Sequence, residues 1–212
     1  VVLDLGSSDG TLEILQSSGC RIILHPWVPV VELVRLRAIQ ACNNDWILVL
    51  DPDEIVPATL AKTMLKIVSD NQFDAVSFPW RNIMFGRWIQ HAGWAQDRHV
   101  RLFRRGFVHY STNVHVPETV AGRVLHLEAE EGNYIEHYNY SSVEQFVEKL
   151  NRYTTQEARK ENDDTAGISV ENLVRMPFRE FAERFFWLKG ENDGPQGLAV
   201  SILMAFYSST AS

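Results

Sequence analysis

The chain has 212 residues, of which 45% are hydrophobic and 22% are charged, and its formal net charge is −7. Such a chain is long enough for one large α/β domain, alone or with an appendage, and has the composition of an ordinary globular protein. The acidic balance argues against a nucleic-acid backbone as the main partner, so we expect no nucleic-acid binding. The two cysteines have neither metal-site nor redox spacing, which favours a reducing, cytoplasmic compartment.

The first eleven residues, VVLDLGSSDGT, indicate a strand, a polar turn and the start of a helix that ends near Gly19. One interpretation is a corner of the fold that needs glycine for backbone reasons. In the other, Asp4 at the end of the strand hydrogen-bonds a base or a sugar. Because the sequence begins inside a strand pattern, we expect the first strand of a parallel sheet to be missing.

Five apolar residues, 46–50, predict a strand buried on both faces of a parallel sheet. The acidic loop Asp51-Pro52-Asp53-Glu54 follows directly. Ligands of open α/β sheets bind at the carboxyl ends of strands. Two aspartates one residue apart can both contact a cation such as Mg²⁺ or Mn²⁺, which prefers oxygen ligands. An acidic loop after a strand is also an ordinary turn or helix cap, so both interpretations stay open.

The flanking segments fit an α/β pattern. A strand is expected over residues 21–24, and a helix over about 31–41 carries Arg35, which could equally be a solvated surface arginine. A helix beginning at Pro57 and ending near Asp70 leads to a strand over residues 75–79.

Residues 80–94 are rich in aromatic side chains. An exposed Trp beside an Arg suits stacking on a sugar ring, although a Trp is more often part of a core. A strand is expected over residues 100–104, and Asp97 precedes it. With Arg98 beside it, Asp97 could belong to a weak surface ion pair.

The last third of the chain predicts two strands, over residues 122–127 and 133–138, and then a helix that runs to about residue 160. A polar linker over residues 161–167 separates this part from two amphipathic stretches, 178–188 and 197–207. We therefore expect a domain over residues 1–160 and a helical extension over 161–212. Short helices with aromatic and basic residues suit a membrane interface, but they also suit a sheet edge or a contact between two copies of the chain. The apolar run 198–207 is too short to span a bilayer.

Taken together, these strings resemble family-two glycosyltransferases of the GT-A fold. The opening string is similar to the V-D-x-G-S-x-D-G-T signature of that family, and it precedes the Asp-x-Asp pair as it does there. The resemblance implies an α/β domain with a Rossmann-like, mostly parallel sheet flanked by helices. It also implies that Asp4, Arg35 and Asp51 bind the donor nucleotide sugar.

The resemblance extends to the residues that carry the chemistry. In the family an acidic residue after a glycine-containing loop is the general base, and a downstream histidine can complete a Mn²⁺ or Mg²⁺ site. Gly93, Asp97 and His115 occur in that order here. Asp97 is therefore the candidate base, and His115 is a candidate metal ligand beside Asp51 and Asp53. A strand histidine that is satisfied by the backbone is the alternative for His115.

The later strings RLFRR, HYNY and KLNRYT are similar to those of lipopolysaccharide-core glucosyltransferase-like proteins. Val116 departs from that group, which usually has Glu at this position, and Glu118 lies two residues further on. The segment over residues 80–94 faces the acceptor in the family, and the candidate acceptor-binding residues are Trp94, Glu118 and His137. Whether His115 or His137 contacts the metal stays open.

The resemblance implies an inverting, metal-dependent glycosyltransferase that moves a sugar from a nucleotide-diphosphate donor, with UDP-sugars first, to a hydroxyl of a glycan or lipid-linked glycan. Peripheral contact with the inner face of the cytoplasmic membrane and homo-oligomerisation are further expectations.

Two alternatives remain. A haloacid-dehalogenase-type phosphatase would use Asp51 as nucleophile, but it leaves the opening string unexplained and predicts Thr or Val at Ile55. A non-catalytic, truncated transferase-like binding module would account for the missing strand and for Val116, but not for the intact Asp51, Asp53 and Asp97.

Overall fold

The computed structural model describes residues 1–110, 118–130, 132–160 and 170–210. His115, Val116 and the linker over residues 161–167 lie outside the described residues. The first half contains these elements: β1 (Val2–Asp4), α1 (Thr11–Ser17), β2 (Ile22–Leu24), a 3₁₀ turn (Val31–Leu33), α2 (Arg35–Gln40), β3 (Trp46–Leu48), β4 (Glu54–Ile55), α3 (Ala58–Asp70), β5 (Ala75–Met84), β6 (Arg87–Trp88) and β7 (Arg98–Arg104). The second half contains β8 (Val108–His109), β9 (Thr119–Val120), β10 (Val124–His126), β11 (Ile135–Tyr140), α4 (Val143–Lys160), α5 (Val170–Ala182), a π-helical turn (Glu183–Trp187), a 3₁₀ turn (Gly190–Asp193) and α6 (Gly194–Thr210).

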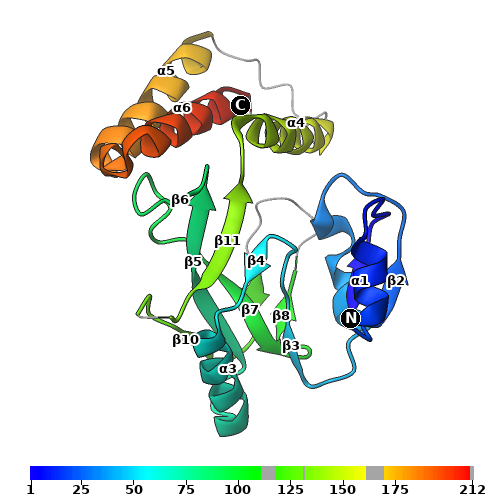
Figure 1. The fold of residues 1–212 in the computed structure, drawn as a ribbon. Helices are drawn as coiled ribbons and strands as arrows, with labels where there is room; N and C mark the ends of the chain where they lie inside the picture. Colours follow the sequence, from blue (N-terminus) through cyan, green and yellow to red (C-terminus); the bar gives the residue numbers. More distant parts are fainter. Residues whose placement is uncertain (111–117, 131, 161–169, 211–212) are drawn as a thin grey trace.

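The central sheet is mixed, so the prediction of a mostly parallel sheet is wrong. Its strands lie in the order β3-β7-β5-β11-β4, and β6 and β10 also pair with β5. The long strand β5 runs parallel to β10 and β11 but antiparallel to β6 and β7. This arrangement, with helices around it, is consistent with the expected α/β class (Figure 1).

The strand over residues 46–50 is not buried on both faces, which corrects a second expectation. Only residues 46–48 form β3, which lies at an end of the strand order and pairs antiparallel with β7. Ile47 is buried, whereas Leu48 is 38% exposed and Leu50 is 41% exposed. A short apolar run does not by itself distinguish a central strand from an edge strand.

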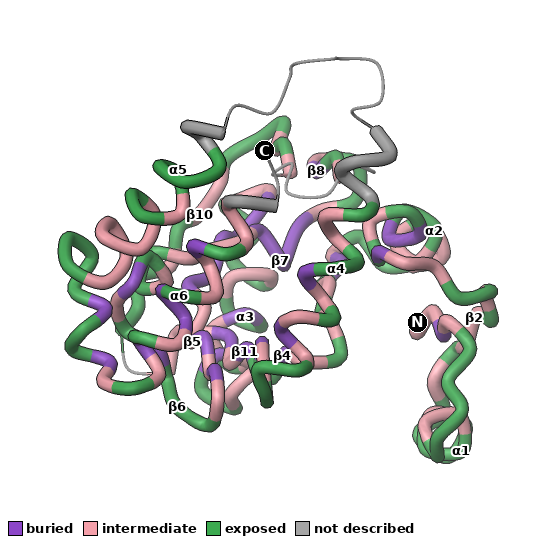
Figure 2. The backbone as a smooth tube through the Cα atoms, turned by 90° about the horizontal axis from the view of Figure 1, so that it is seen from above, coloured by how far each residue is buried: buried purple, intermediate pink, exposed green. Residues whose placement is uncertain are grey.

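The N-terminal elements form a separate unit beside the sheet. Strands β1 and β2 pair with each other in parallel and make a two-stranded sheet of their own. Helix α1 has no buried residue, and it lies with β2 at one side of the molecule (Figures 1 and 2). The helix expected over residues 31–41 is divided into the 3₁₀ turn and α2.

Two apolar clusters pack against the sheet. In the first, α3 contributes Leu60 and Met64, whose spacing of four residues places them on one helical face. They pack against Val76 and Phe78 of β5 and against Ile135 of β11. The second cluster is formed by Ile47, Ala75, Val100, Phe103 and Val108. These clusters hold β5, β7 and β11 in place, and the same strands carry the polar residues of the candidate site.

The C-terminal helices α5 and α6 pack against each other and are attached to the segment after β6. The buried carboxylate of Asp193 accepts hydrogen bonds from the backbone N–H groups of Gln90 (3.2 Å) and His91 (2.8 Å). Val200 of α6 packs with Met84 and Ile89 in a third apolar cluster. Helical structure over 178–188 and 197–207 is thus confirmed. Within the described part of the chain, no helix combines the length and apolarity needed to cross a membrane.

Candidate active site

The acidic loop 51–54 lies between β3 and β4, and strand β11 holds it from the side. Glu54 pairs with His137 in the antiparallel β4–β11 ladder. The backbone N–H of Tyr138 donates to the carbonyl oxygen of Asp53 (2.8 Å). These main-chain contacts place the side chains of the loop next to those of β11, which lies more than eighty residues further along the chain.

Asp51 faces two arginines. Its Oδ2 atom accepts hydrogen bonds from Arg35 of α2 (3.2 Å) and Arg101 of β7 (3.0 Å). Arg35 is only 9% exposed, so the alternative of a solvated surface arginine is wrong. Its Nη1 atom is buried and has no hydrogen-bond partner among the described residues. A buried donor without a partner is costly, and an anionic ligand would satisfy it.

Arg101 reaches the loop because of a bulge in β7. Val76 pairs with Leu102 but the next residue, Ser77, pairs with Val100, so Arg101 is the extra residue. A bulge of this kind re-aims a side chain. Arg101 is thereby brought against Glu54 as well as Asp51. Burial raises the pKa of Glu54 above its ordinary value, while the charge of Arg101 opposes that rise.

Asp53 lies beside two groups that carry or can carry positive charge. Its Oδ2 atom is 3.3 Å from Nζ of Lys149 on α4 and 3.7 Å from Nε2 of His137 on β11. Burial alone would raise the pKa of Asp53. The hydrogen bond and charge of His137, together with Lys149, outweigh burial and lower this pKa to about 2. Asp53 is therefore ionised at neutral pH.

Asp97 is hydrogen-bonded on both carboxylate oxygens. Asn82 Nδ2 donates to Oδ2 (3.0 Å), and His99 Nε2 lies 3.1 Å from Oδ1. The Arg98 side chain donates a hydrogen bond to the carbonyl oxygen of Leu127. Asp97 and Arg98 therefore do not form the surface ion pair that was the alternative interpretation. Burial would raise the pKa of Asp97, but His99 foremost, and then Asn82, lower it below its ordinary value.

Asp97 and Asp53 are connected through two further side chains. The Oδ1 atom of Asn82 lies 2.8 Å from Nδ1 of His137, whose other ring nitrogen faces Asp53. Trp80 packs against the rings of both His99 and His137, each with a centroid distance of 4.1 Å. The candidate base and the candidate metal ligand therefore lie at the two ends of one row of side chains, in which hydrogen bonds join Asp97, Asn82 and His137 and a 3.7 Å contact joins His137 to Asp53.

The remaining predicted residues have other surroundings. The Asp4 carboxylate accepts hydrogen bonds from the backbone N–H groups of Gly6 (3.0 Å) and Ser7 (3.1 Å) within its own turn. Its pKa is lowered, chiefly by the Ser7 hydroxyl. Trp94 packs, partly buried, on the cluster around Met84. Glu118 accepts a hydrogen bond from the backbone N–H of Val100 (2.6 Å), a contact that fixes its carboxylate to β7.

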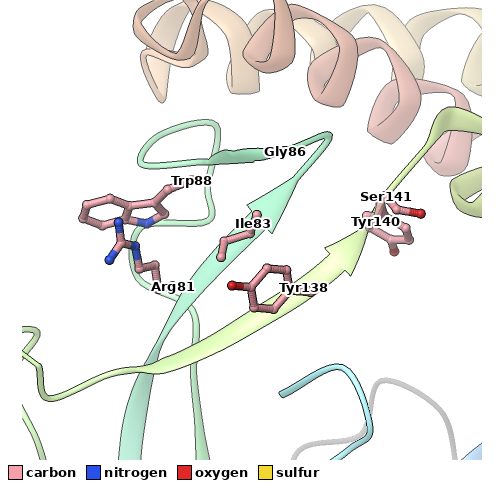
Figure 3. A pocket seen from close by; sticks show the side chains of 7 residues that line it. All are labelled: Arg81, Ile83, Gly86, Trp88, Tyr138, Tyr140 and Ser141. Carbon is pink, nitrogen blue, oxygen red and sulfur yellow. The ribbon is translucent and has the colours of Figure 1, made fainter. Parts of the chain in front are cut away.

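An open hollow of about 510 Å³ lies over β5, β6 and β11. It is lined by Arg81, Ile83, Gly86, Trp88, Tyr138, Tyr140 and Ser141 (Figure 3). The guanidinium of Arg81 stacks on the ring of Trp88 at 4.5 Å, and Tyr138 is 47% exposed. Trp88, which is 40% exposed, is therefore a partly exposed Trp beside an Arg within the aromatic segment.

Sequence reasoning missed four polar residues of this site: Asn82, His99, Arg101 and Lys149. For the first three, one signal was available, because each lies inside a predicted or adjoining strand segment and is followed directly by an apolar residue. Polar residues at such positions are buried only when they have partners. Lys149 gives no such signal, since a lysine on an amphipathic helix is ordinarily solvated.

The chain is similar to known glycosyltransferases. Residues 1–123 match the family model described as glycosyl transferase family 2. An uncharacterized glycosyltransferase of Rickettsia conorii is 26% identical over 219 residues, an alignment that covers 97% of this chain and 76% of that protein. An uncharacterized glycosyltransferase of Rickettsia typhi is 25% identical over 219 residues, an alignment that covers 97% of this chain and 73% of that protein. A TPR repeat-containing protein of Synechococcus elongatus is 43% identical over 54 residues, which cover 26% of this chain and 13% of that protein.

The family model covers more than half of the chain and includes the acidic loop, Asn82, Asp97 and Arg101. The match thus contains most of the polar row described above and argues against both the phosphatase and the non-catalytic module. The chain belongs to glycosyl transferase family 2 and is a glycosyltransferase.

Proposed function

We propose that the chain is an inverting, metal-dependent glycosyltransferase that transfers a sugar from a nucleotide-diphosphate donor to a hydroxyl of a glycan or lipid-linked glycan. The donor is a UDP-sugar, and the acceptor chemistry follows the lipopolysaccharide-core glucosyltransferase-like proteins that the sequence resembles. The observation that carries this proposal is the row Asp97–Asn82–His137–Asp53, which links an ionised candidate base to an ionised candidate cation ligand.

The residues around Asp53 fit a divalent cation. Its carboxylate oxygen and Nε2 of His137 are 3.7 Å apart. Neighbouring ligands of an octahedral cation with bonds of about 2.1 Å lie about 3.0 Å apart, so the two side chains would approach each other slightly on binding it. Mg²⁺-type sites commonly use one or two protein side chains and take their other ligands from substrate phosphates and water. The described residues contain no group of three His, Cys, Asp or Glu side chains arranged to hold a metal, and His115 lies outside them.

When bound, the cation would act as a Lewis acid that stabilises the negative charge of the leaving diphosphate. The chain adds its own positive charge on either side. Arg35 carries the buried, unpartnered Nη1, and Lys149 places an ammonium beside Asp53. We assign these two residues, with Asp51 orienting Arg35, to the diphosphate and nucleotide end of the donor. Asp4 would hold the nucleotide only after its carboxylate leaves the backbone N–H groups of its own turn.

Asp97 is assigned as the general base. The acceptor oxygen forms a bond to the anomeric carbon while the bond from that carbon to the β-phosphate oxygen breaks. The hydroxyl proton passes to the Asp97 carboxylate, and the bonding electrons leave with the nucleoside diphosphate. Attack by the acceptor oxygen from the face opposite the leaving group predicts inversion. Its lowered pKa keeps Asp97 ionised, and general-base help typically contributes about 10²–10⁴-fold.

The acceptor side and the location of the enzyme belong to the same proposal. Trp88 and Arg81 in the open hollow offer an aromatic ring and a cation to a saccharide. Phe178 (73% exposed) and Trp187 (70% exposed) on the C-terminal helices would contact the inner face of the cytoplasmic membrane or a second copy of the chain.

The test is calorimetric titration of UDP into the protein, once with Mn²⁺ and once with EDTA. We expect binding that requires Mn²⁺ and that is lost in Asp53→Ala. The exposed Asp70→Ala on α3 serves as the matched control and should bind like the wild type. Equal binding by Asp53→Ala and the wild type would overturn the assignment of the site. If UDP does not bind in either condition, the proposal of a UDP-sugar donor fails.

A further inference from the structure

Asn82 lies near the C-terminal end of β5 and has no exposed surface. Both ends of its side-chain amide are used, since Nδ2 lies 3.0 Å from Asp97 Oδ2 and Oδ1 lies 2.8 Å from His137 Nδ1. The residue therefore joins the candidate base to the candidate cation ligand without itself facing solvent. A buried amide with both groups satisfied is held in one orientation.

The donor and acceptor roles along this row are determined by chemistry. An ionised carboxylate only accepts hydrogen bonds, so the NH₂ group of Asn82 must face Asp97. The carbonyl oxygen of Asn82 must then face His137, and a carbonyl oxygen also only accepts. Nδ1 of His137 must therefore carry the proton. The reverse orientation of the amide would place two acceptors against each other at the Asp97 contact.

A proton on Nδ1 determines what the other ring nitrogen can do. Without a cation, a second proton on Nε2 gives the charged ring that lowers the pKa of Asp53. In the neutral ring, which cation binding requires, Nε2 is left with a lone pair 3.7 Å from Asp53. A lone pair at this position can bind a cation together with Asp53, whereas a proton there could only donate to the carboxylate. A hydrogen bond to the ring nitrogen that does not bind the metal orients a histidine ligand, and its loss typically weakens metal binding by about 10–100-fold.

We propose that Asn82 is the positioning residue that sets the tautomer of His137 and at the same time holds Asp97 as an ionised base. This inference rests on the proposed function. One amide thus aligns the two halves of the site, so that the group that binds the cation and the group that accepts the proton are ordered together. Asn82 touches neither substrate nor cation in this role.

The first test reads the tautomer directly and needs neither substrate nor metal. The ring nitrogens of His137 are observed by ¹⁵N NMR at about pH 8.5, above the usual histidine pKa of about 6.5. We expect the Nδ1–H form in the wild type. In Asn82→Leu, which has a similar size and no polar side-chain atoms, we expect the Nε2–H form. The buried Ser77→Ala on the same strand is the control and should leave the His137 signal unchanged. An Nε2–H form in the wild type would overturn the inference.

The second test measures Mn²⁺ affinity in the presence of UDP and the pH dependence of the transfer rate. Asn82→Leu should bind Mn²⁺ about tenfold or more weakly, whereas Asn82→Asp still offers an acceptor oxygen to Nδ1–H of His137 and should keep its Mn²⁺ affinity. Asn82→Asp places a second carboxylate beside Asp97, and the repulsion between them favours protonation. As the pH is lowered, the transfer rate of this variant should therefore begin to fall at a higher pH than that of the wild type. Asn82→Asp has the shape of the native side chain, which keeps the inference testable if Asn82→Leu does not fold.

The two tests separate the inference from the function on which it rests. If the wild type binds Mn²⁺ and UDP, but Asn82→Leu binds Mn²⁺ equally well and Asn82→Asp has the pH profile of the wild type, the inference is overturned and the proposed function stands. If the wild type does not bind Mn²⁺ and UDP, the proposed function fails. The NMR result then still decides whether Asn82 sets the tautomer.

Discussion

Nζ of Lys149 lies 3.3 Å from Oδ2 of Asp53, although the two residues are 96 positions apart in the sequence. The same ammonium donates to the carbonyl oxygen of Asn139 (3.0 Å) and lies 5.0 Å from the centre of the Tyr140 ring. Helix α4 therefore contributes a charge to the acidic loop, as well as an apolar face to the fold. Removal of that charge should affect the donor site more than the fold.

Replacing Lys149 by Met should weaken UDP binding by about tenfold or more, because a charged hydrogen-bond donor near the diphosphate is lost. The apolar stem is retained, so the free energy of unfolding should change much less. Calorimetry with UDP and Mn²⁺ measures the effect. The exposed Lys62→Met on α3 is the matched control. An unchanged UDP affinity in Lys149→Met would remove Lys149 from the donor site.

Asp97→Asn should lower the transfer rate by about 10²–10⁴-fold, since an amide cannot accept the proton of the acceptor hydroxyl. UDP affinity should stay within a few-fold of the wild type, because Asp97 contacts His99 and Asn82 and not the acidic loop. Initial-rate kinetics and calorimetry on the same preparation separate the two effects. If the rate of Asp97→Asn equals that of the wild type, Asp97 is not the base.

Acid should weaken the fold partly through Asp53. Its pKa is about 2 in the folded chain against an ordinary value of 3.8, so the folded state binds this proton less readily than the unfolded state. The resulting stabilisation is present above about pH 4 and is lost as the pH falls toward 2. It amounts to at most about 2.5 kcal/mol, and less after allowance for solvent screening at a side chain that is 32% exposed.

Urea unfolding of the wild type and of Asp53→Asn at several pH values between about 7 and 2 tests this prediction. Asp53→Asn cannot titrate at this position, so the difference in unfolding free energy between the two proteins should shrink as the pH falls. A constant difference across that range would contradict the lowered pKa. Glu54, whose pKa is raised, contributes with the opposite sign in both proteins and cancels in the comparison.

Replacing Arg101 by Met should lower the free energy of unfolding by about 3–5 kcal/mol, because it leaves the fully buried Glu54 carboxylate without its partner. The double variant Arg101→Met/Glu54→Leu should recover most of the loss, since no charge is then left buried. Arg123→Met removes a guanidinium that is 71% exposed and should change stability by less than about 1 kcal/mol. Equal losses in the single and double variants would contradict this account.

The sequence was informative where one element alone carries the pattern. The helix expected from Pro57 to near Asp70 agrees with α3, Ala58–Asp70. The start of α4 is equally local, since Ser142 Oγ accepts a hydrogen bond from the Gln145 N–H at 3.1 Å. The acidic pair and Asp97 were likewise recognised from short strings. In each case the physical cause is local, so a single sequence contains it.

The remaining features depend on contacts between distant segments. The contact between Asn82 and His137 joins residues 55 positions apart, and β3 pairs with a strand more than fifty residues later. An apolar run does not specify the direction or the position of a strand in its sheet, which is why a mixed sheet was taken for a mostly parallel one. The partners of Asn82 and Arg101 could be identified only once β5, β7 and β11 lay side by side.

The extra residue in β7 makes this site sensitive to the length of the chain rather than to its composition. Arg101 is added between two paired positions of the ladder. Deleting one residue there would leave a regular ladder in which His99 and Leu102 keep their partners on β5, because the bulge already absorbs the extra residue. No residue would then remain at the position from which Arg101 reaches Asp51 and Glu54, and the acidic loop would lose that positive charge. Variation in this strand is therefore expected as exchange of residues at constant length.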